Sequence, residues 1–187
     1  GYAFSSTIDK GYCDFFVGLV HSDENDDVRD HHFVYTKPYV GVGFVLAVQG
    51  KASKVKTLAE IKEKKLKVGV PMLSPMEEYV RNNKMEYELY SQSHGIIDGM
   101  IKREVDAAMM WSGALAVAKN DFDVEFDVVS DFVPQPGQRW NGVWVVKEKE
   151  IQLKAFLDDE LQTMLKQGKI QSIVESYYMP FYEPFVN

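Results

Sequence analysis

The chain has 187 residues, of which 45% are hydrophobic and 26% charged, and it carries a formal net charge of -7 with a pI near 5.1. This is the composition of an ordinary soluble globular protein with one domain or two small ones and a real core. The acidic balance, without a basic patch and interleaved aromatics, excludes a nucleic-acid surface. No apolar run approaches the roughly 18 residues of a membrane span, so membrane insertion is not expected.

The first third of the chain predicts short elements around an acidic segment. Residues 3–10 are typical of a helix end, residues 13–17 of a strand that Gly18 ends, and residues 33–35 and 40–48 of two further strands. The acidic residues between 23 and 30 are expected to be solvated, because so many like charges cannot share a core. The lone cysteine, Cys13, fits either a reduced interior thiol or one half of a disulfide with a partner outside this sequence.

The middle of the chain alternates helix and strand. Thr57 is expected to cap a helix at 58–64, and Pro75 to be the first residue of another helix with acidic residues in its first turn. Strands are expected at 66–70, 85–90, 107–110 and 124–129, and helices at 93–103 and 113–119. This alternation predicts crossover units and a mostly parallel sheet.

The last third predicts a returning strand at 140–146, an amphipathic helix at 151–166 ended by a left-handed Gly168, and a final helix at 170–178. The expected fold class is α/β with two lobes. Lobe one comprises 1–48 and 133–187, lobe two comprises 49–132, and two crossing strands join them as a hinge. Clefts between such lobes are the usual place for a ligand.

Several segments resemble, in order and spacing, the type II periplasmic solute-binding proteins of the polar amino acid class, family 3. They are GYCDFFVG at 11–18, Arg29, YTKPY at 35–39, TLAEI at 57–61, KVGV at 67–70 and VDAA at 105–108. The resemblance implies the periplasmic binding protein type II fold and a periplasmic location. It also implies that strands which open lobe one in that family are missing, so that lobe one is expected to be incomplete.

The family's binding residues are only partly present. Arg29 stands where the family keeps the arginine that binds a ligand α-carboxylate, but it is equally explained as a surface ion-pair residue. Glu24 replaces a small hydroxyl residue, and Pro75 removes a backbone donor. Trp111 stands where the family has the acid that binds the ligand's amine. The candidate ligand-binding residues are Arg29, Tyr39, Ser74 and Trp111.

These departures resemble one branch, the binding-protein-like accessory proteins encoded beside pyrroloquinoline quinone (PQQ) methanol dehydrogenases. The likeness rests on DAAMMW at 106–111, Gly113, Cys13 with Asp14, and YMP at 178–180. It implies a non-catalytic periplasmic factor, without a cofactor, that interacts with or activates a quinoprotein methanol dehydrogenase, with a lanthanide-dependent enzyme as one alternative. Members of that branch carry a second cysteine, which would explain the solitary Cys13.

Two other groups of residues have more than one explanation. His21, His31 and His32 lie near the acidic segment and could bind a divalent metal or lanthanide, but the segment lacks a calcium loop's glycine and terminal glutamate, and no metal site is predicted. The aromatic C-terminal segment is explained by core packing or by a partner surface. The candidate partner-surface residues are Tyr178, Phe181, Tyr182 and Phe185.

No catalytic pattern is present: the chain has no nucleophile elbow, no phosphate-binding loop and no zinc-helix signature. Two hypotheses remain. The first is the accessory factor for a periplasmic methanol dehydrogenase. The second is the substrate-binding receptor of an ABC importer for a small polar solute, favoured by the architecture and by Arg29.

Overall fold

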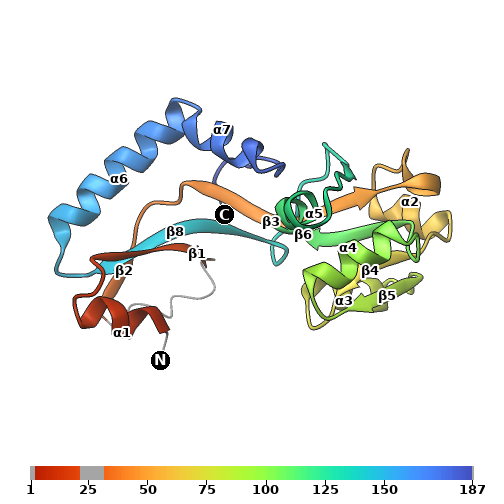
Figure 1. Cartoon of the computed structure of the whole chain (residues 1–187), viewed down its shortest axis with the longest axis horizontal. Helices are drawn as coiled ribbons and strands as arrows, with labels where there is room; N and C mark the ends of the chain where they lie inside the picture. The colour runs from red at the N-terminus through yellow and green to blue at the C-terminus, as the bar shows by residue number, and fades with distance from the viewer. Residues whose placement is uncertain (1–2, 22–31, 187) are drawn as a thin grey trace. The chain divides into compact units, whose positions relative to one another are not determined.

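The structure is a computed structural model that describes residues 3–21 and 32–186. The chain separates into two compact units (Figure 1). Unit 1 consists of Gly1–Val42, Trp140–Glu175 and Phe181–Asn187, and unit 2 of Gly43–Arg139 and Ser176–Pro180. These limits differ by several residues from the lobe boundaries expected at 48/49 and 132/133, which remain a prediction.

Unit 1 is built on β8 (Arg139–Lys147), against which β1 (Phe15–His21) and β2 (Phe33–Tyr35) pair antiparallel. The expected end of β1 at Gly18 is wrong. The strand continues through Gly18 to His21, because this glycine takes a left-handed backbone (φ 78°) at a register shift between Phe16 and Leu19. The expectation that Cys13 is an interior thiol is also wrong, because this thiol is free and exposed.

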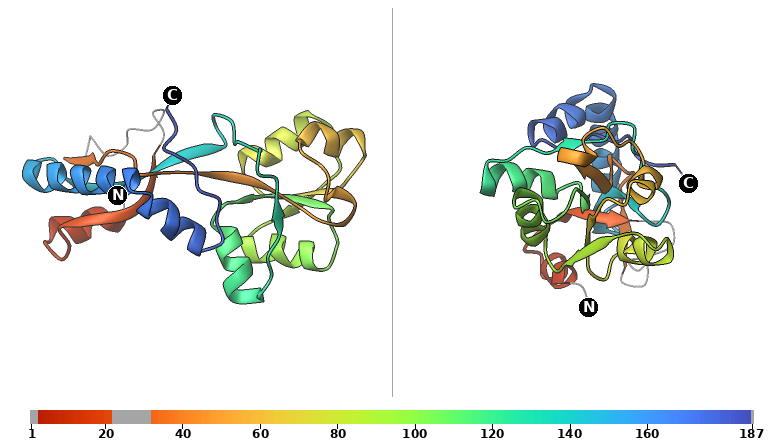
Figure 2. Two further views of the ribbon diagram at one scale, coloured as in Figure 1. Left: turned by 90° about the horizontal axis from the view of Figure 1, so that it is seen from above. Right: turned by 90° about the vertical axis from the view of Figure 1, so that its right-hand side faces the viewer.

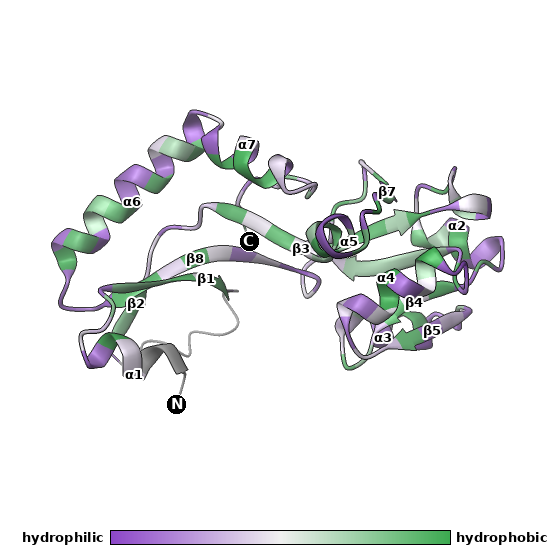
Figure 3. Cartoon of the chain, in the orientation of Figure 1, coloured by the Kyte–Doolittle hydropathy of each residue, from purple (hydrophilic) through white to green (hydrophobic). Residues whose placement is uncertain are grey.

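Helices cover both faces of the unit 1 sheet. On one face, Ile8 of α1 (Ala3–Asp9) packs with Phe33 and Val145. On the other face, Leu161 of α6 (Ile151–Lys166) and Ile170 of α7 (Lys169–Ser176) pack with Val40. Both views show α6 alongside the strands of this unit (Figures 1 and 2), and the alternating colours of α6 reflect its amphipathic sequence (Figure 3).

Unit 2 contains a mixed sheet in the order β3-β6-β4-β5, with β7 on the outer side of β3. Its strands are β3 (Val40–Val48, entering from unit 1), β4 (Val68–Pro71), β5 (Tyr87–Tyr90), β6 (Ala107–Trp111) and β7 (Asp127–Val128). The parallel pairs are β4 with β5 and β4 with β6. By contrast, β6 and β7 both pair antiparallel with β3. The expectation of a mostly parallel sheet is therefore wrong, because β3 runs against β6 at the centre.

The helices of unit 2 are η2 (Gly50–Ala52), α2 (Leu58–Glu63), α3 (Pro75–Asn82), α4 (Ser93–Ile101) and α5 (Ala114–Phe122). The chemistry of the first residues explains where α2 and α3 begin. Thr57 caps α2 by accepting the Glu60 backbone N–H at 3.2 Å, and Pro75 occupies the first position of α3, as expected. Left-handed Gly168 (φ 70°) follows α6 in unit 1, also as expected.

The core of unit 2 lies between its sheet and its helices. Leu46 of β3 and Met109 of β6 are fully buried and face each other across the antiparallel pair. Helix α4 packs against β4, β6 and α5, and buries Ile97 and Met100. These buried apolar contacts form a packed core between the sheet and the helices of unit 2.

Candidate functional site

Strands β4, β5 and β6 end at the same edge of the unit 2 sheet, because they run parallel. Helices α3, α4 and α5 begin within a few residues of these ends. We call residues 71–75, 90–93 and 111–114 the carboxyl edge. In open α/β sheets ligands bind at this edge, where loops and helix N-termini supply backbone donors. Two predicted ligand residues, Ser74 and Trp111, belong to it.

Trp111 is the last residue of β6, and its side chain is partly buried. Its ring packs edge-on against Phe44 with the centroids 6.1 Å apart. A Cβ at Gly113 would lie 3.2 Å from indole Cδ1 and 3.3 Å from Nε1, so the indole lies directly against Gly113. Trp111 therefore forms a flat aromatic surface beside the N-terminus of α5.

Ser112 is a further candidate at the carboxyl edge, and no motif in the sequence indicated it. It is 1% exposed, and its hydroxyl makes no hydrogen bond within the described residues. Helix α5 begins directly after it, with Gly113 at the N-cap and no side-chain cap. Leaving a buried hydroxyl unpaired costs about 1–3 kcal/mol, unless a water or ligand satisfies it. The only sequence signal was a hydroxyl residue at the end of an apolar strand.

Ser74 has a structural role at the start of α3. Its hydroxyl donates to the Pro71 carbonyl at 2.7 Å and accepts the Glu77 backbone N–H at 3.3 Å. The hydroxyl hydrogen is thus used within the loop, which leaves at most an acceptor for a ligand. A ligand-binding role of Ser74 stays a prediction.

One backbone donor of the 71–75 loop, the Leu73 N–H, is occupied by the chain itself. The Leu73 N–H donates to the Glu77 carboxylate at 2.7 Å, and the Arg81 guanidinium donates to the same side chain at 2.7 and 3.0 Å. The Leu73 N–H, and after it Arg81, hold the pKa of Glu77 below its usual value. A ligand carboxylate would therefore have to displace Glu77 from this position.

The other two predicted ligand residues lie elsewhere. Tyr39 belongs to unit 1, where its backbone N–H donates to Gly142 O at 3.1 Å and its ring lies edge-on to Trp144 at 6.0 Å. Arg29, with Glu24, lies outside the described residues. The roles predicted for Tyr39 and Arg29 are untested by this geometry and stay predictions.

The aromatic C-terminal segment is largely packed rather than free. Phe181 packs into the cluster around Leu161, Tyr182 forms a β-bridge with Gly41, and the Phe185 ring lies against the same glycine. Burial raises the pKa of Tyr182. By contrast, Tyr178 is 49% exposed, and the Lys119 ammonium lies 5.3 Å from its ring centroid. Of the four predicted partner-surface residues, Tyr178 is thus the exposed one.

The histidines do not form a recognisable metal centre in the part that the structure describes. The His21 ring packs against Tyr35 with centroids 4.3 Å apart, His32 lies 3.9 Å from Glu148, and His31 is outside the described residues. Within residues 3–21 and 32–186, no three His, Cys, Asp or Glu side chains are placed to share a metal ion. Across the same ranges no helix is long and apolar enough to cross a bilayer.

The fold and the carboxyl edge define the class: a mixed α/β protein with the two-lobed fold of periplasmic solute-binding proteins. The second substrate-binding domain of an amino acid ABC transporter from Streptococcus pneumoniae is similar at a TM-score of 0.72 and 17% identity, over 92% of this chain and 76% of that one. The unliganded, open L-cystine solute receptor of Neisseria gonorrhoeae is similar at a TM-score of 0.71 and 18% identity, over 92% of this chain and 70% of that one.

An ancestral cyclohexadienyl dehydratase is also similar, at a TM-score of 0.63 and 18% identity, over 93% of this chain and 71% of that one. The same fold therefore occurs both in solute receptors and in an enzyme. At the sequence level, no family model and no curated protein matches the chain. These similarities establish the fold alone, because one fold supports many different functions.

Proposed function

We propose that this protein is a non-catalytic, extracytoplasmic solute-binding receptor that serves an ABC importer for a small polar solute. The observation that carries this proposal is the pairing at the carboxyl edge of the buried, unpartnered Ser112 hydroxyl with the uncapped N-terminus of α5. A helix N-terminus attracts an anionic or acceptor group, and the serine hydroxyl can complete its hydrogen bonds. The fold shared with amino acid receptors supports the same class.

The residues also restrict the solute. With Trp111 at the end of β6, the amine of an amino acid has no carboxylate partner at that position, and the indole instead favours a planar or apolar face. The Leu73 N–H already donates to the Glu77 carboxylate, so a carboxylate of the solute is directed to the N-terminus of α5 rather than to that of α3. We therefore propose a solute that carries one carboxylate or similar acceptor group and an apolar face, rather than an ordinary α-amino acid.

A thermal-shift screen of carboxylates and polar solutes other than α-amino acids tests the proposal. A true ligand raises the melting temperature by mass action, by the equivalent of about 2.7 kcal/mol at a hundred times its Kd. The shift should fall in Trp111→Ala and Ser112→Ala. It should persist in Ser172→Ala, a matched change at an exposed serine of α7. No shift from any solute, or equal shifts in all variants, would overturn the proposal.

The accessory role for a PQQ methanol dehydrogenase is a second candidate. It rests on the sequence resemblance and on the exposure of Tyr177 and Tyr178, at 56% and 49%. Exposed neighbouring aromatics are common at protein interfaces. Calorimetric titration of the chain into a purified quinoprotein methanol dehydrogenase should show saturable binding that weakens in Tyr177→Ser/Tyr178→Ser. Absence of binding would leave the receptor as the only candidate.

A further inference from the structure

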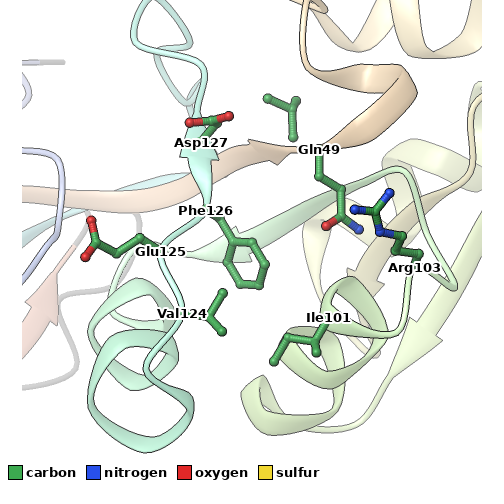
Figure 4. A pocket seen from close by; sticks show the side chains of 8 residues that line it. Gln49, Ile101, Arg103, Val124, Glu125, Phe126 and Asp127 are labelled. Carbon is green, nitrogen blue, oxygen red and sulfur yellow. The ribbon is translucent and has the colours of Figure 1, made fainter.

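A hollow lies in unit 2, formed by the end of β3, the turn after α4 and the segment that leads into β7 (Figure 4). Its volume is about 310 Å³, at the lower limit of the range typical of small-molecule sites. Val48, at the end of β3, pairs with Ala107 at the start of β6, whereas Trp111 ends that strand. The hollow is therefore at the opposite end of β6 from the carboxyl edge.

The hollow has an apolar wall. Figure 4 shows the Phe126 ring projecting inward between Val124 on one side and Ile101 on the other. Phe126 is only partly buried, and Ile101 is 41% exposed. These three side chains leave apolar surface in contact with water, and a ligand's apolar group would gain free energy by covering it.

The rim carries two opposite charges that remain uncompensated. Neither Arg103 nor Asp127 takes part in an ion pair or a side-chain hydrogen bond among the described residues, although both line the hollow. Glu125 differs, because its carboxylate is 2.9 Å from the Lys119 ammonium. An unpaired guanidinium and an unpaired carboxylate around one hollow fit a ligand that is itself a zwitterion.

Gln49 supplies a fixed acceptor. Its side-chain amide nitrogen donates to the Met100 carbonyl at 2.6 Å and to the Val105 carbonyl at 3.0 Å. Both amide hydrogens are thus used, so the orientation of the group is set and its oxygen remains as an acceptor. In Figure 4 this oxygen is turned to the side on which Phe126 lies.

From these four features we propose that the hollow is a second ligand site, separate from the carboxyl edge, for a small α-amino acid with an apolar side chain. The ligand's carboxylate binds the Arg103 guanidinium, and its ammonium binds Asp127 and the Gln49 oxygen. Its side chain packs on Phe126. This recognition needs no residue of the carboxyl edge, so it stands or falls independently of the proposed receptor function.

L-Leucine is a suitable probe, with N-acetyl-L-leucine and L-leucinamide as analogues that lack the ammonium or the carboxylate charge. Titration of the full chain, followed by amide NMR, should shift the Gln49 side-chain and Phe126 backbone signals in a saturable way with leucine. Each analogue should bind at least about tenfold more weakly, since each loses one charge-assisted contact.

Arg103→Gln and Asp127→Asn should each weaken leucine binding by about ten- to a hundredfold, with unchanged cooperative melting as the folding control. Two control variants should leave leucine binding unchanged. Lys149→Gln removes one positive charge, as Arg103→Gln does, at an exposed residue of unit 1, and Trp111→Ala alters the carboxyl edge. The proposal is overturned if leucine, at concentrations on the order of 10 mM, shifts no NMR signal of the residues around the hollow. It is overturned equally if Trp111→Ala abolishes binding while Arg103→Gln does not.

Discussion

The Leu73 backbone N–H donates a hydrogen bond of 2.7 Å to the Glu77 carboxylate, so the chain's own acid occupies a backbone donor beside the candidate solute site. Leu73 holds a left-handed backbone (φ 56°) with its side chain 98% exposed. Such a conformation is unfavourable for leucine and persists only where surrounding contacts fix it. The contact from Glu77 is one that fixes it here.

Glu77 should give the protein an acid-dependent stability. Its folded pKa is lowered, first by the Leu73 N–H and then by Arg81, so its stabilisation is present above the unfolded pKa, near 4.5, and is lost as pH falls through the folded value. The melting temperature of Glu77→Gln should therefore lie below that of the wild type at pH 6 and converge with it as pH falls below about 4.5. A gap that persists or widens on acidification would refute the assignment.

Removing the Glu77 carboxylate should open the 71–75 loop to an external anion. In Glu77→Ala the Leu73 N–H loses its acceptor, and Arg81 loses its partner. Acetate should then raise the melting temperature more in Glu77→Ala than in the wild type or in Glu78→Ala. Equal acetate effects in all three proteins would show that the loop does not accept anions.

The fit of Tyr90 against α4 predicts a size limit at Gly99. A Cβ on Gly99 would overlap the Tyr90 hydroxyl and lie 2.5 Å from ring Cζ, whereas a Cβ on Gly95 would lie 3.4 Å from Cδ1, an ordinary contact. Gly99→Ala should cost about 1–3 kcal/mol in the free energy of unfolding, despite the better helix propensity of alanine. Gly95→Ala should be neutral or stabilising. Chemical denaturation measures both, and a neutral Gly99→Ala would mean that the ring moves freely.

The outer strand of unit 1 should promote self-association. β1 pairs with β8, and among its residues Val17 and Val20 are 49% and 50% exposed. An exposed apolar strand at a sheet edge favours pairing with another copy, and lysine at such positions opposes it. Val17→Lys/Val20→Lys should lower the weight-average mass in light scattering at high concentration, and Val133→Lys, on an exposed loop residue, should not. A wild-type protein that is monomeric at every concentration would contradict this expectation.

Local sequence signals predicted most elements, because each depends on neighbouring residues. The Thr57 cap, Pro75 at the start of α3 and Gly168 after α6 occur where expected. The direction of pairing was not predictable in this way: β3 runs antiparallel to β6, a relation between segments about 60 residues apart. Gly18 was misjudged because a glycine can either end a strand or form a bulge within it.

The candidate site was predictable only where a residue type had a distinctive position. Trp111 was proposed as a ligand residue because it stands where the resembled family has the acid that binds the ligand's amine, and its role stays a prediction. Ser112 was missed, because a buried unpaired hydroxyl is a property of packing and not of sequence. The Glu77 contact with Leu73 was likewise hidden, since an acid in a first helical turn ordinarily needs only the helix dipole to explain it.

Tryptophan fluorescence tests the central claim, that solute binds at the carboxyl edge beside Trp111, most directly. The chain has three tryptophans, Trp111, Trp140 and Trp144. Titration with a solute found in the thermal-shift screen should change the emission of the wild type and of Trp140→Phe to similar extents. The change should disappear in Trp111→Phe. A full emission change that persists in Trp111→Phe, with an unaltered Kd, would place the solute elsewhere and contradict the account.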